Sequence, residues 1–191
     1  MDVKKQMAGS VQLINQVQED EKLIGSLHNT ITLLLDTYRR DGKVLFCGNG
    51  GSAADAQHLA AELSGCFYLD REPLNAEALH VNTSFITATA NDHGFEVIYE
   101  RLVKATGKPG DVLMAFSTSG LSPNIIRALQ AAKDMNMKTV GFTGQDGGHM
   151  PEWCDIVFHV PSVDTPRIQE IHMLLGHIIC ENVESMLFDK G

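Results

Sequence analysis

Two residues that could bind a metal ion or transfer a proton, His58 and Glu62, lie four positions apart. The segment around them has helical spacing, and an i,i+4 pair points both side chains to one face of a helix. An imidazole and a carboxylate held side by side can coordinate zinc or act as an acid–base pair. The alternative is that both belong to a solvated polar face with no chemical role.

The same helix is predicted to begin at a glycine-rich segment, Gly48-Asn49-Gly50-Gly51-Ser52, which follows the apolar run of residues 43–47. A strand that ends in glycines and opens a helix exposes backbone N–H groups at the positive end of the helix dipole, where anions bind. The segment formally matches G-x-G-x-x-A, but no acidic residue ends the candidate second strand and no P-loop lysine is present. We therefore favour a sugar phosphate over a nucleotide or a plain structural turn.

A second loop rich in small polar residues follows the strong strand predicted at residues 111–116. It carries four hydroxyl groups within six residues, those of Ser117, Thr118, Ser119 and Ser122. Ser122 is a good N-cap and Pro123 suits the first position of the next helix, but a cap needs only one hydroxyl. The surplus favours a phosphate site built from hydroxyl and backbone N–H donors.

The last predicted helix, residues 165–188, carries polar side chains among many apolar ones. Spacing alone pairs Glu170 with His177, which lie seven positions apart. Gln169 and His177 are eight positions apart and about 80° apart around the helix, so they could also reach one cleft. Periodicity does not choose between these two pairs.

These loops must be positioned by alternating strands and helices. The strands are predicted at residues 43–47, 76–80, 111–116, 138–142 and 155–160, and the helices between and after them at residues 83–91, 95–105 and 123–136, besides the helix after the glycines and the last helix. Such alternation indicates an α/β fold with a mostly parallel five-stranded sheet covered on both faces. In a 2-1-3-4-5 strand order the glycine and serine loops flank the crevice where ligands bind.

The length of 191 residues fits one domain. We expect residues 1–41 to form a helical extension of two helices and residues 42–191 the α/β core. The extension either packs on the sheet or provides an oligomer interface.

Composition limits the partners of the protein. Hydrophobic residues make up 43% of the chain, charged residues 20%, and the formal net charge is −9. The negative charge argues against nucleic acid binding, although it allows a small phosphorylated ligand. The four cysteines are scattered, no apolar run is long enough for a membrane span and no signal-type core begins the chain. We therefore expect a cytoplasmic protein that does not enter a membrane.

Together these motifs resemble the SIS-domain phosphoheptose isomerases, also called sedoheptulose 7-phosphate isomerases. The resemblance runs in order over nearly the whole chain. It rests on Cys-Gly-Asn-Gly-Gly-Ser at 47–52, His58-x-x-x-Glu62, Ala90-Asn91-Asp92, Ser117-Thr118-Ser119-Gly120-x-Ser122, Thr143-Gly144-x-Asp146-Gly147-Gly148 and Arg167-Ile168-Gln169-Glu170-Ile171-His172.

The resemblance implies a three-layer, flavodoxin-like SIS domain with two extra N-terminal helices, assembled as a homotetramer with active sites shared between subunits. It also implies an enzyme that converts the phosphorylated seven-carbon sugar D-sedoheptulose 7-phosphate to D-glycero-D-manno-heptose 7-phosphate. This reaction is the first step toward the nucleotide-activated heptose of lipopolysaccharide or other surface glycans.

The family's site residues carry over to matching positions here. The substrate site would contain Asn49, Gly50, Gly51, Ser52, Glu62, Asn91, Asp92, Ser117, Thr118, Ser119, Ser122 and Gln169. One Zn²⁺ per subunit would be held by His58, Glu62, Gln169 and His177. Since aldose–ketose isomerisation needs a base and an acid, we assign Glu62 as the general base and His177 as the partner acid.

One position departs from the family pattern. Cys66 stands where family members usually carry an arginine, and Arg71 is a candidate to compensate. A neutral thiol cannot bind a phosphate or sugar hydroxyl as a guanidinium does, so this departure bears on the choice of substrate more than on the reaction class. The alternative function is a non-catalytic SIS protein, either a replication-initiator-associating factor or a sugar-phosphate-sensing regulator. The presence of both Glu62 and His177 favours the enzyme.

Overall fold

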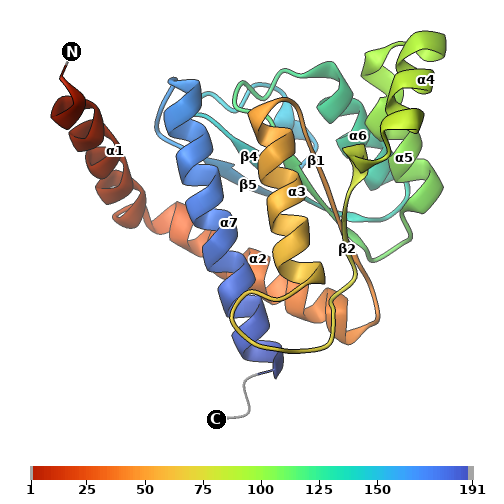
Figure 1. Cartoon of the computed structure of the whole chain (residues 1–191), viewed down its shortest axis with the longest axis horizontal. Coiled ribbons are helices and arrows are strands. Elements are labelled where there is room, and N and C mark those ends of the chain that lie inside the picture. Colours follow the sequence, from red (N-terminus) through yellow and green to blue (C-terminus); the bar gives the residue numbers. More distant parts are fainter. Residues whose placement is uncertain (1, 189–191) are drawn as a thin grey trace.

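A parallel sheet of five strands lies between two layers of helices (Figure 1). The structure is a computed structural model that describes residues 2–188. The strands are β1 (Val44–Gly48), β2 (Ala76–Ala78), β3 (Val112–Phe116), β4 (Lys138–Thr143) and β5 (Ile156–His159). Their order is β2-β1-β3-β4-β5 and all four neighbouring pairs are parallel. The predicted α/β fold and strand order are confirmed.

The helices divide between the two faces of the sheet. Their bounds are α1 (Val3–Gln18), α2 (Glu21–Arg39), α3 (Gly51–Ser64), α4 (Thr83–His93), α5 (Ile98–Thr106), α6 (Pro123–Asp134) and α7 (Thr165–Phe188). Apolar side chains of α2, α3 and α7 form one core with one face of the sheet, and those of α5 and α6 form a second core with the other. Alternate residues of β1 enter different cores, Phe46 the first and Cys47 the second. A strand buried on both faces explains the continuous apolar runs in the sequence.

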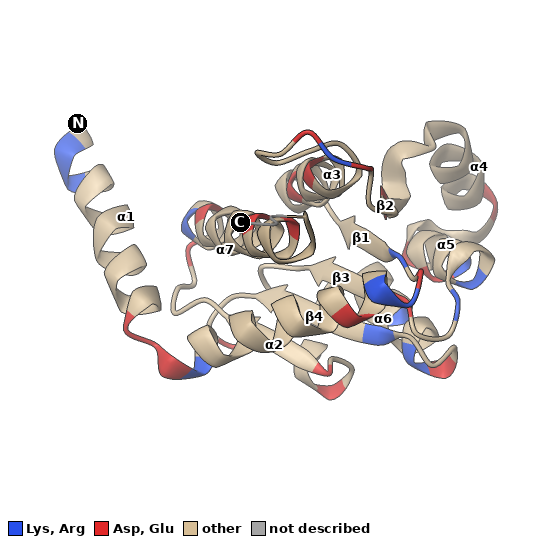
Figure 2. Ribbon diagram, turned by 90° about the horizontal axis from the view of Figure 1, so that it is seen from below, with Lys and Arg blue, Asp and Glu red and all other residues tan. Residues whose placement is uncertain are grey.

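Helix α1 extends away from the rest of the molecule (Figure 2). It buries only Leu13 and Val17. Its other large apolar side chains are exposed, namely Val3, Met7, Val11 and Ile14. The first predicted helix therefore has an apolar face that this chain does not cover.

Three short stretches differ from the predicted boundaries. The second predicted strand ends at Ala78, since Leu79–Val81 turn into a 3₁₀ helix that buries Leu79 in the second core. The helix predicted at residues 95–105 begins with a 3₁₀ turn, Phe95–Val97. The helix predicted to reach residue 136 ends at Asp134, because Asn136 takes a left-handed conformation with φ of 57°.

Candidate active site

The glycine loop turns β1 into α3 within a few residues. Gly50 has a φ of +57°, which favours glycine, and a Cβ on Gly48 would lie 2.3 Å from the carbonyl oxygen of Ser52. Helix α3 begins at Gly51 without a capping side chain. Its first N–H groups are thus available at the end of the helix dipole that attracts anions.

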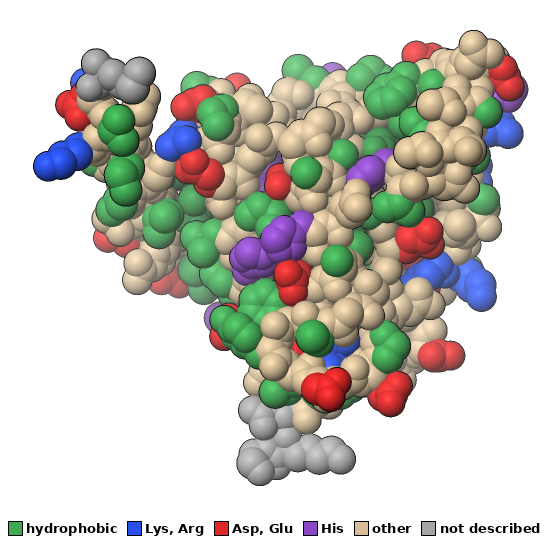
Figure 3. Space-filling view, in the orientation of Figure 1, with side chains coloured by type: hydrophobic (Ala, Val, Ile, Leu, Met, Phe, Trp, Pro, Cys, Tyr) green, Lys and Arg blue, Asp and Glu red, His purple; other side chains and the backbone are tan. Residues whose placement is uncertain are grey.

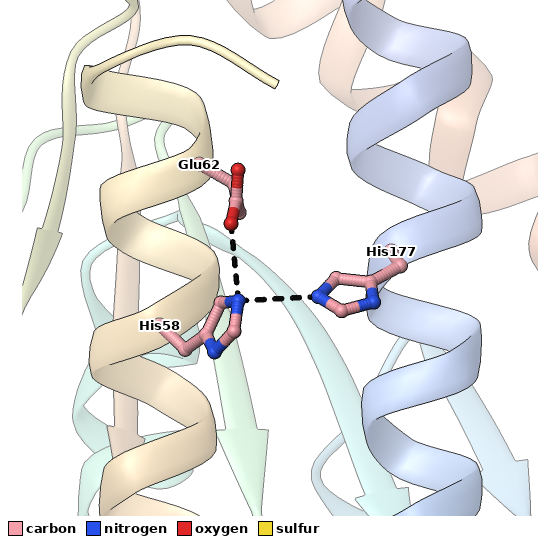
Figure 4. A group of neighbouring side chains, drawn as sticks. All are labelled: His58, Glu62 and His177. Atoms are coloured by element: carbon pink, nitrogen blue, oxygen red, sulfur yellow. Dashed lines mark hydrogen bonds and ion pairs between the residues drawn. The ribbon is translucent and has the colours of Figure 1, made fainter. Parts of the chain in front are cut away.

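Three side chains converge between α3 and α7 (Figure 4). Nε2 of His58 lies 3.0 Å from Oε1 of Glu62 and 3.2 Å from Nε2 of His177. His58 is exposed, and Glu62 and His177 are half-buried. In the space-filling view, histidine side chains gather at the centre of this face beside acidic and apolar side chains (Figure 3). The trio is therefore open to a ligand from solvent.

The donor set fits a metal ion. Nε2 of His58 faces a carboxylate oxygen and a second imidazole nitrogen and carries at most one proton itself. Two donors that are each ~2.0 Å from a tetrahedral zinc lie ~3.3 Å apart, close to the distances of 3.0 and 3.2 Å from His58 to Glu62 and to His177. Two imidazoles and a carboxylate also leave a coordination position free for a substrate oxygen.

Close packing of α3 against α7 brings the trio together. A Cβ on Gly176 would lie 2.5 Å from the side chain of Leu59, so a larger residue would displace that side chain or separate the two helices. The contact falls one residue before His177 on α7 and one residue after His58 on α3. Glycine at this position thus allows close packing of α3 and α7 beside the three side chains.

The two candidate partners of His177 on α7 point in different directions. The side-chain amide of Gln169 lies against Gly51 at the start of α3, where a Cβ would come within 2.6 Å of its Nε2. Glu170 instead pairs with Arg167 at 2.6 Å and accepts a hydrogen bond from Ser10 of α1. Gln169 thus faces the glycine loop and Glu170 faces away from it.

The serine loop lies between β3 and α6 and is held by its neighbours. The Ser117 hydroxyl donates to that of Ser122 at 3.2 Å, and Ser122 makes no capping bond to α6. The carbonyl of Thr118 accepts from the N–H of Gly144 after β4. Pro123 has no N–H group and the N–H groups of Ile125 and Ile126 donate to the Ser122 carbonyl, so the N–H of Asn124 is the donor of this first turn that can receive a phosphate oxygen.

A pair of asparagines joins the two loops. Nδ2 of Asn49 donates to Oδ1 of Asn124 at 2.9 Å, and Nδ2 of Asn124 donates to Oδ1 of Asn49 at 2.8 Å. Asn124 lies at the second position of α6 and is 3% exposed. Sequence reasoning missed Asn124, since a polar residue near a helix start is usual and nothing in the sequence signals a partner 75 positions away.

Comparison with known proteins identifies this arrangement. A family model described as the SIS domain matches residues 7–144. A phosphoheptose isomerase of Clostridium acetobutylicum is 46% identical over 188 residues, 98% of this chain and 96% of that protein. The chain belongs to the phosphoheptose isomerase family of SIS-domain proteins. The predicted family and enzyme class, a sugar-phosphate isomerase, are thereby confirmed.

Solved structures of this family have the same fold. A phosphoheptose isomerase from Neisseria gonorrhoeae, 40% identical, superposes with a TM-score of 0.90 and covers 96% of this chain and 97% of its own. Another from Francisella tularensis, 33% identical, superposes with a TM-score of 0.92 and covers 96% of both chains. The two N-terminal helices of the present chain therefore belong to the fold of the phosphoheptose isomerases.

Arg71 does not compensate for Cys66, so that prediction is wrong. The Arg71 side chain is 2% exposed, and its Nε donates to Oε1 of Glu184 at 2.8 Å. Its terminal nitrogens donate to the carbonyls of Glu62, Leu63 and Glu72. Four of the five guanidinium N–H groups are therefore used within the protein, and the buried side chain does not reach a ligand. Cys66 itself is exposed beyond the end of α3.

Glu184 is the buried acceptor around which Arg71 and the loop after α3 are held, an arrangement called the clasp below. It accepts backbone N–H groups from Phe67, Tyr68 and Leu69 at 2.6–2.9 Å, in addition to Arg71. Burial alone would raise the pKa of Glu184, but these hydrogen bonds outweigh it and the pKa is lowered. The clasp fixes the loop after α3, whose Phe67 ring packs edge-on against His177.

Two other predicted site residues lie apart from the trio. Asn91 and Asp92 are exposed at the end of α4, and Nδ2 of Asn91 donates to Oδ1 of Asp92 at 2.8 Å.

Asp55, which sequence reasoning did not single out, lies one turn before His58 on α3. Burial raises the pKa of the Asp55 carboxyl to about 6, and the charge of His58 opposes this shift. No helix within residues 2–188 is both long and apolar enough to cross a membrane.

Proposed function

We propose that this protein converts D-sedoheptulose 7-phosphate to D-glycero-D-manno-heptose 7-phosphate, the first step toward a nucleotide-activated heptose. The observation that carries the proposal is the convergence of His58, Glu62 and His177 between α3 and α7. Isomerisation moves a proton between the two carbons that carry the carbonyl and the neighbouring hydroxyl. It therefore needs one group that removes a proton and another that returns a proton to oxygen or carbon.

Glu62 is the proposed general base and His177 the proposed acid. The ring of His58, 3.0 Å from Glu62, orients the carboxylate toward the open side of the trio. His177 reaches the same point from the opposite helix, so base and acid can act on adjacent atoms of one substrate. Phe67 covers one edge of the His177 ring and limits its rotation.

The same trio, with Gln169 as a fourth candidate, would hold one Zn²⁺ per subunit. Bound there, zinc would polarise the substrate carbonyl and stabilise the charge of the enediolate. The fit of the donor spacing supports His58, Glu62 and His177 as ligands. Gln169 supports the site from the glycine loop side of α7.

The phosphate of the substrate is proposed to bind at the serine loop. Ser117, Thr118, Ser119 and Ser122 supply hydroxyl groups beside the N-terminus of α6. The glycine loop, including Gly50, Gly51 and Ser52, would contact the sugar through its backbone at the start of α3. Because Asn91 and Asp92 are exposed on α4, we propose that they contact substrate where subunits of a homotetramer meet.

Turnover of sedoheptulose 7-phosphate, before and after chelation and with zinc added back, tests the proposal. We expect turnover to fall on chelation and to return with zinc. Glu62→Gln should reduce kcat by at least about 10²-fold while the protein stays folded and assembled, because the amide cannot accept the proton. Glu77→Gln, an exposed change on β2, is the matched control. A fully active Glu62→Gln variant would remove this residue from the mechanism.

A further inference from the structure

The paired amides of Asn49 and Asn124 join the two loops at the centre of the sheet. β1 and β3 are neighbours, with Gly48 opposite Phe116 at their carboxyl ends. The glycine loop follows one strand and the serine loop follows the other. The reciprocal hydrogen bonds, 2.9 and 2.8 Å long, connect the glycine loop to the first turn of α6, directly after the serine loop.

We propose that Asn124 is a positioning residue for ligand binding and that Asn49 is its partner, so that the pair acts as a latch between the loops. In this assignment the side chain of Asn49 is not an independent substrate ligand. The inference rests on the proposed function in one respect only, that a phosphorylated ligand spans the two loops.

The geometry favours a latch over a ligand contact. Each amide uses one N–H and one carbonyl lone pair on the other, so a substrate that took one of these groups would break one of the two bonds. Asn124 is 3% exposed, and an unpaired amide there would lose its hydrogen bonds to water as well as to protein. The pair is therefore more stable closed than divided between protein and substrate.

The base of each loop is anchored by hydrogen bonds separate from the latch. At the base of the glycine loop, the buried hydroxyl of Tyr99 donates to the carbonyl of Gly48. On the serine side, the loop is tied to β4 through Gly144 and Thr118. The latch joins these two anchored bases one residue beyond the end of β1, next to the N-termini of both α3 and α6. It thus sets the distance between two anion-attracting helix ends.

A double-mutant cycle tests the latch. The variants are Asn49→Ala, Asn124→Ala and the combination, with exposed Asn15→Ala as the control. The readouts are KM and kcat for sedoheptulose 7-phosphate and, separately, the dissociation constant of inorganic phosphate by calorimetry. We expect each single variant to weaken phosphate binding and raise KM by a similar factor, about 10-fold, with a smaller change in kcat. The double variant should be no worse than either single one.

Other results would overturn the proposal. If Asn49→Ala costs much more than Asn124→Ala and the two effects multiply, Asn49 contacts the ligand by itself. If neither variant changes phosphate binding, or if the wild-type protein binds no phosphate, the pair does not position a ligand site. If phosphate binding follows the cycle but the wild-type protein has no isomerase activity, the latch stands and the proposed function fails.

A second variant covers the case in which alanine prevents folding. Asn124→Asp has nearly the same shape; when protonated, its carboxyl accepts from Asn49 and donates to Asn49, which restores both bonds. When ionised, it lacks the donor and faces the Asn49 carbonyl. We expect phosphate affinity, relative to wild type at the same pH, to fall between pH 5 and pH 8, in the range expected for a buried aspartate. A ratio that stays constant over this range would contradict the latch.

Discussion

Burial determines the protonation state of one histidine outside the site. His172 is fully buried on α7, where its ring packs edge-on against Phe116 and Phe142. Its Nε2 lies 3.3 Å from the Thr143 carbonyl, so the neutral ring donates to the end of β4. Burial lowers the pKa of His172 from 6.5 to about 4, against a smaller opposing effect of that hydrogen bond.

This shift predicts acid destabilisation. Between about pH 6.5 and pH 4 the unfolded chain binds a proton at residue 172 and the folded chain does not, so the free energy of unfolding falls as the pH is lowered. The loss across this window reaches up to ~3 kcal/mol. His172→Gln should flatten the dependence, measured by urea unfolding at pH 7 and pH 5. Exposed His28→Gln serves as control, and an unchanged slope in His172→Gln would refute the assignment.

At the scale of elements, the loop after α3 depends on one buried ion pair. Arg71 and Glu184 are both 2% exposed and satisfy each other together with backbone groups of α3 and the loop. Removing one partner leaves a buried charge without compensation, which is costlier than the net value of the pair.

We therefore predict that Glu184→Ala lowers the free energy of unfolding by ~3–5 kcal/mol, because Arg71 and three backbone N–H groups lose their acceptor. Chemical denaturation measures the change. Glu181→Ala, an exposed change on the same helix, should cost less than ~0.5 kcal/mol. A loss below ~1 kcal/mol for Glu184→Ala would mean that the clasp contributes little.

The sequence predicted elements better than side-chain partners. Strand order followed from the alternation of elements, since short connections and buried parallel strands leave few topologies. His58 and Glu62 were recognisable because helical spacing is local. The choice between Gln169 and Glu170 could not be made from the sequence, because it depends on how α7 is rotated against α3 and α1. Asn124 and Glu184 find partners more than 70 positions away, and only the folded chain brings them together.

At the scale of the whole molecule, α1 presents an uncovered apolar stripe. Val3, Met7, Val11 and Ile14 recur at spacings of three and four and are 40–66% exposed. A continuous apolar surface of this kind usually marks a protein–protein contact. It supports the proposal of a homotetramer in which these helices meet other subunits.

The corresponding prediction is that Met7→Glu together with Val11→Glu dissociates the assembly. Charged side chains would be buried without partners in the contact. Light scattering coupled to size-exclusion chromatography gives the mass of the particle. Gln12→Glu, on the opposite side of α1, should leave that mass unchanged. Retention of the full mass by the double variant would exclude this stripe from the interface.

The four cysteines differ in burial, so a thiol-reactive label would attach selectively at one of them. Burial raises the pKa of the thiols of Cys154 and Cys180 to about 12 and that of Cys47 further, so little thiolate forms at neutral pH. Cys66 is exposed, next to the residue whose ring packs against His177. A fluorophore or spin label attached with a maleimide will therefore react at Cys66 first. Such a label would lie beside His177 and would report the entry of a ligand, and no cysteine would have to be introduced for it.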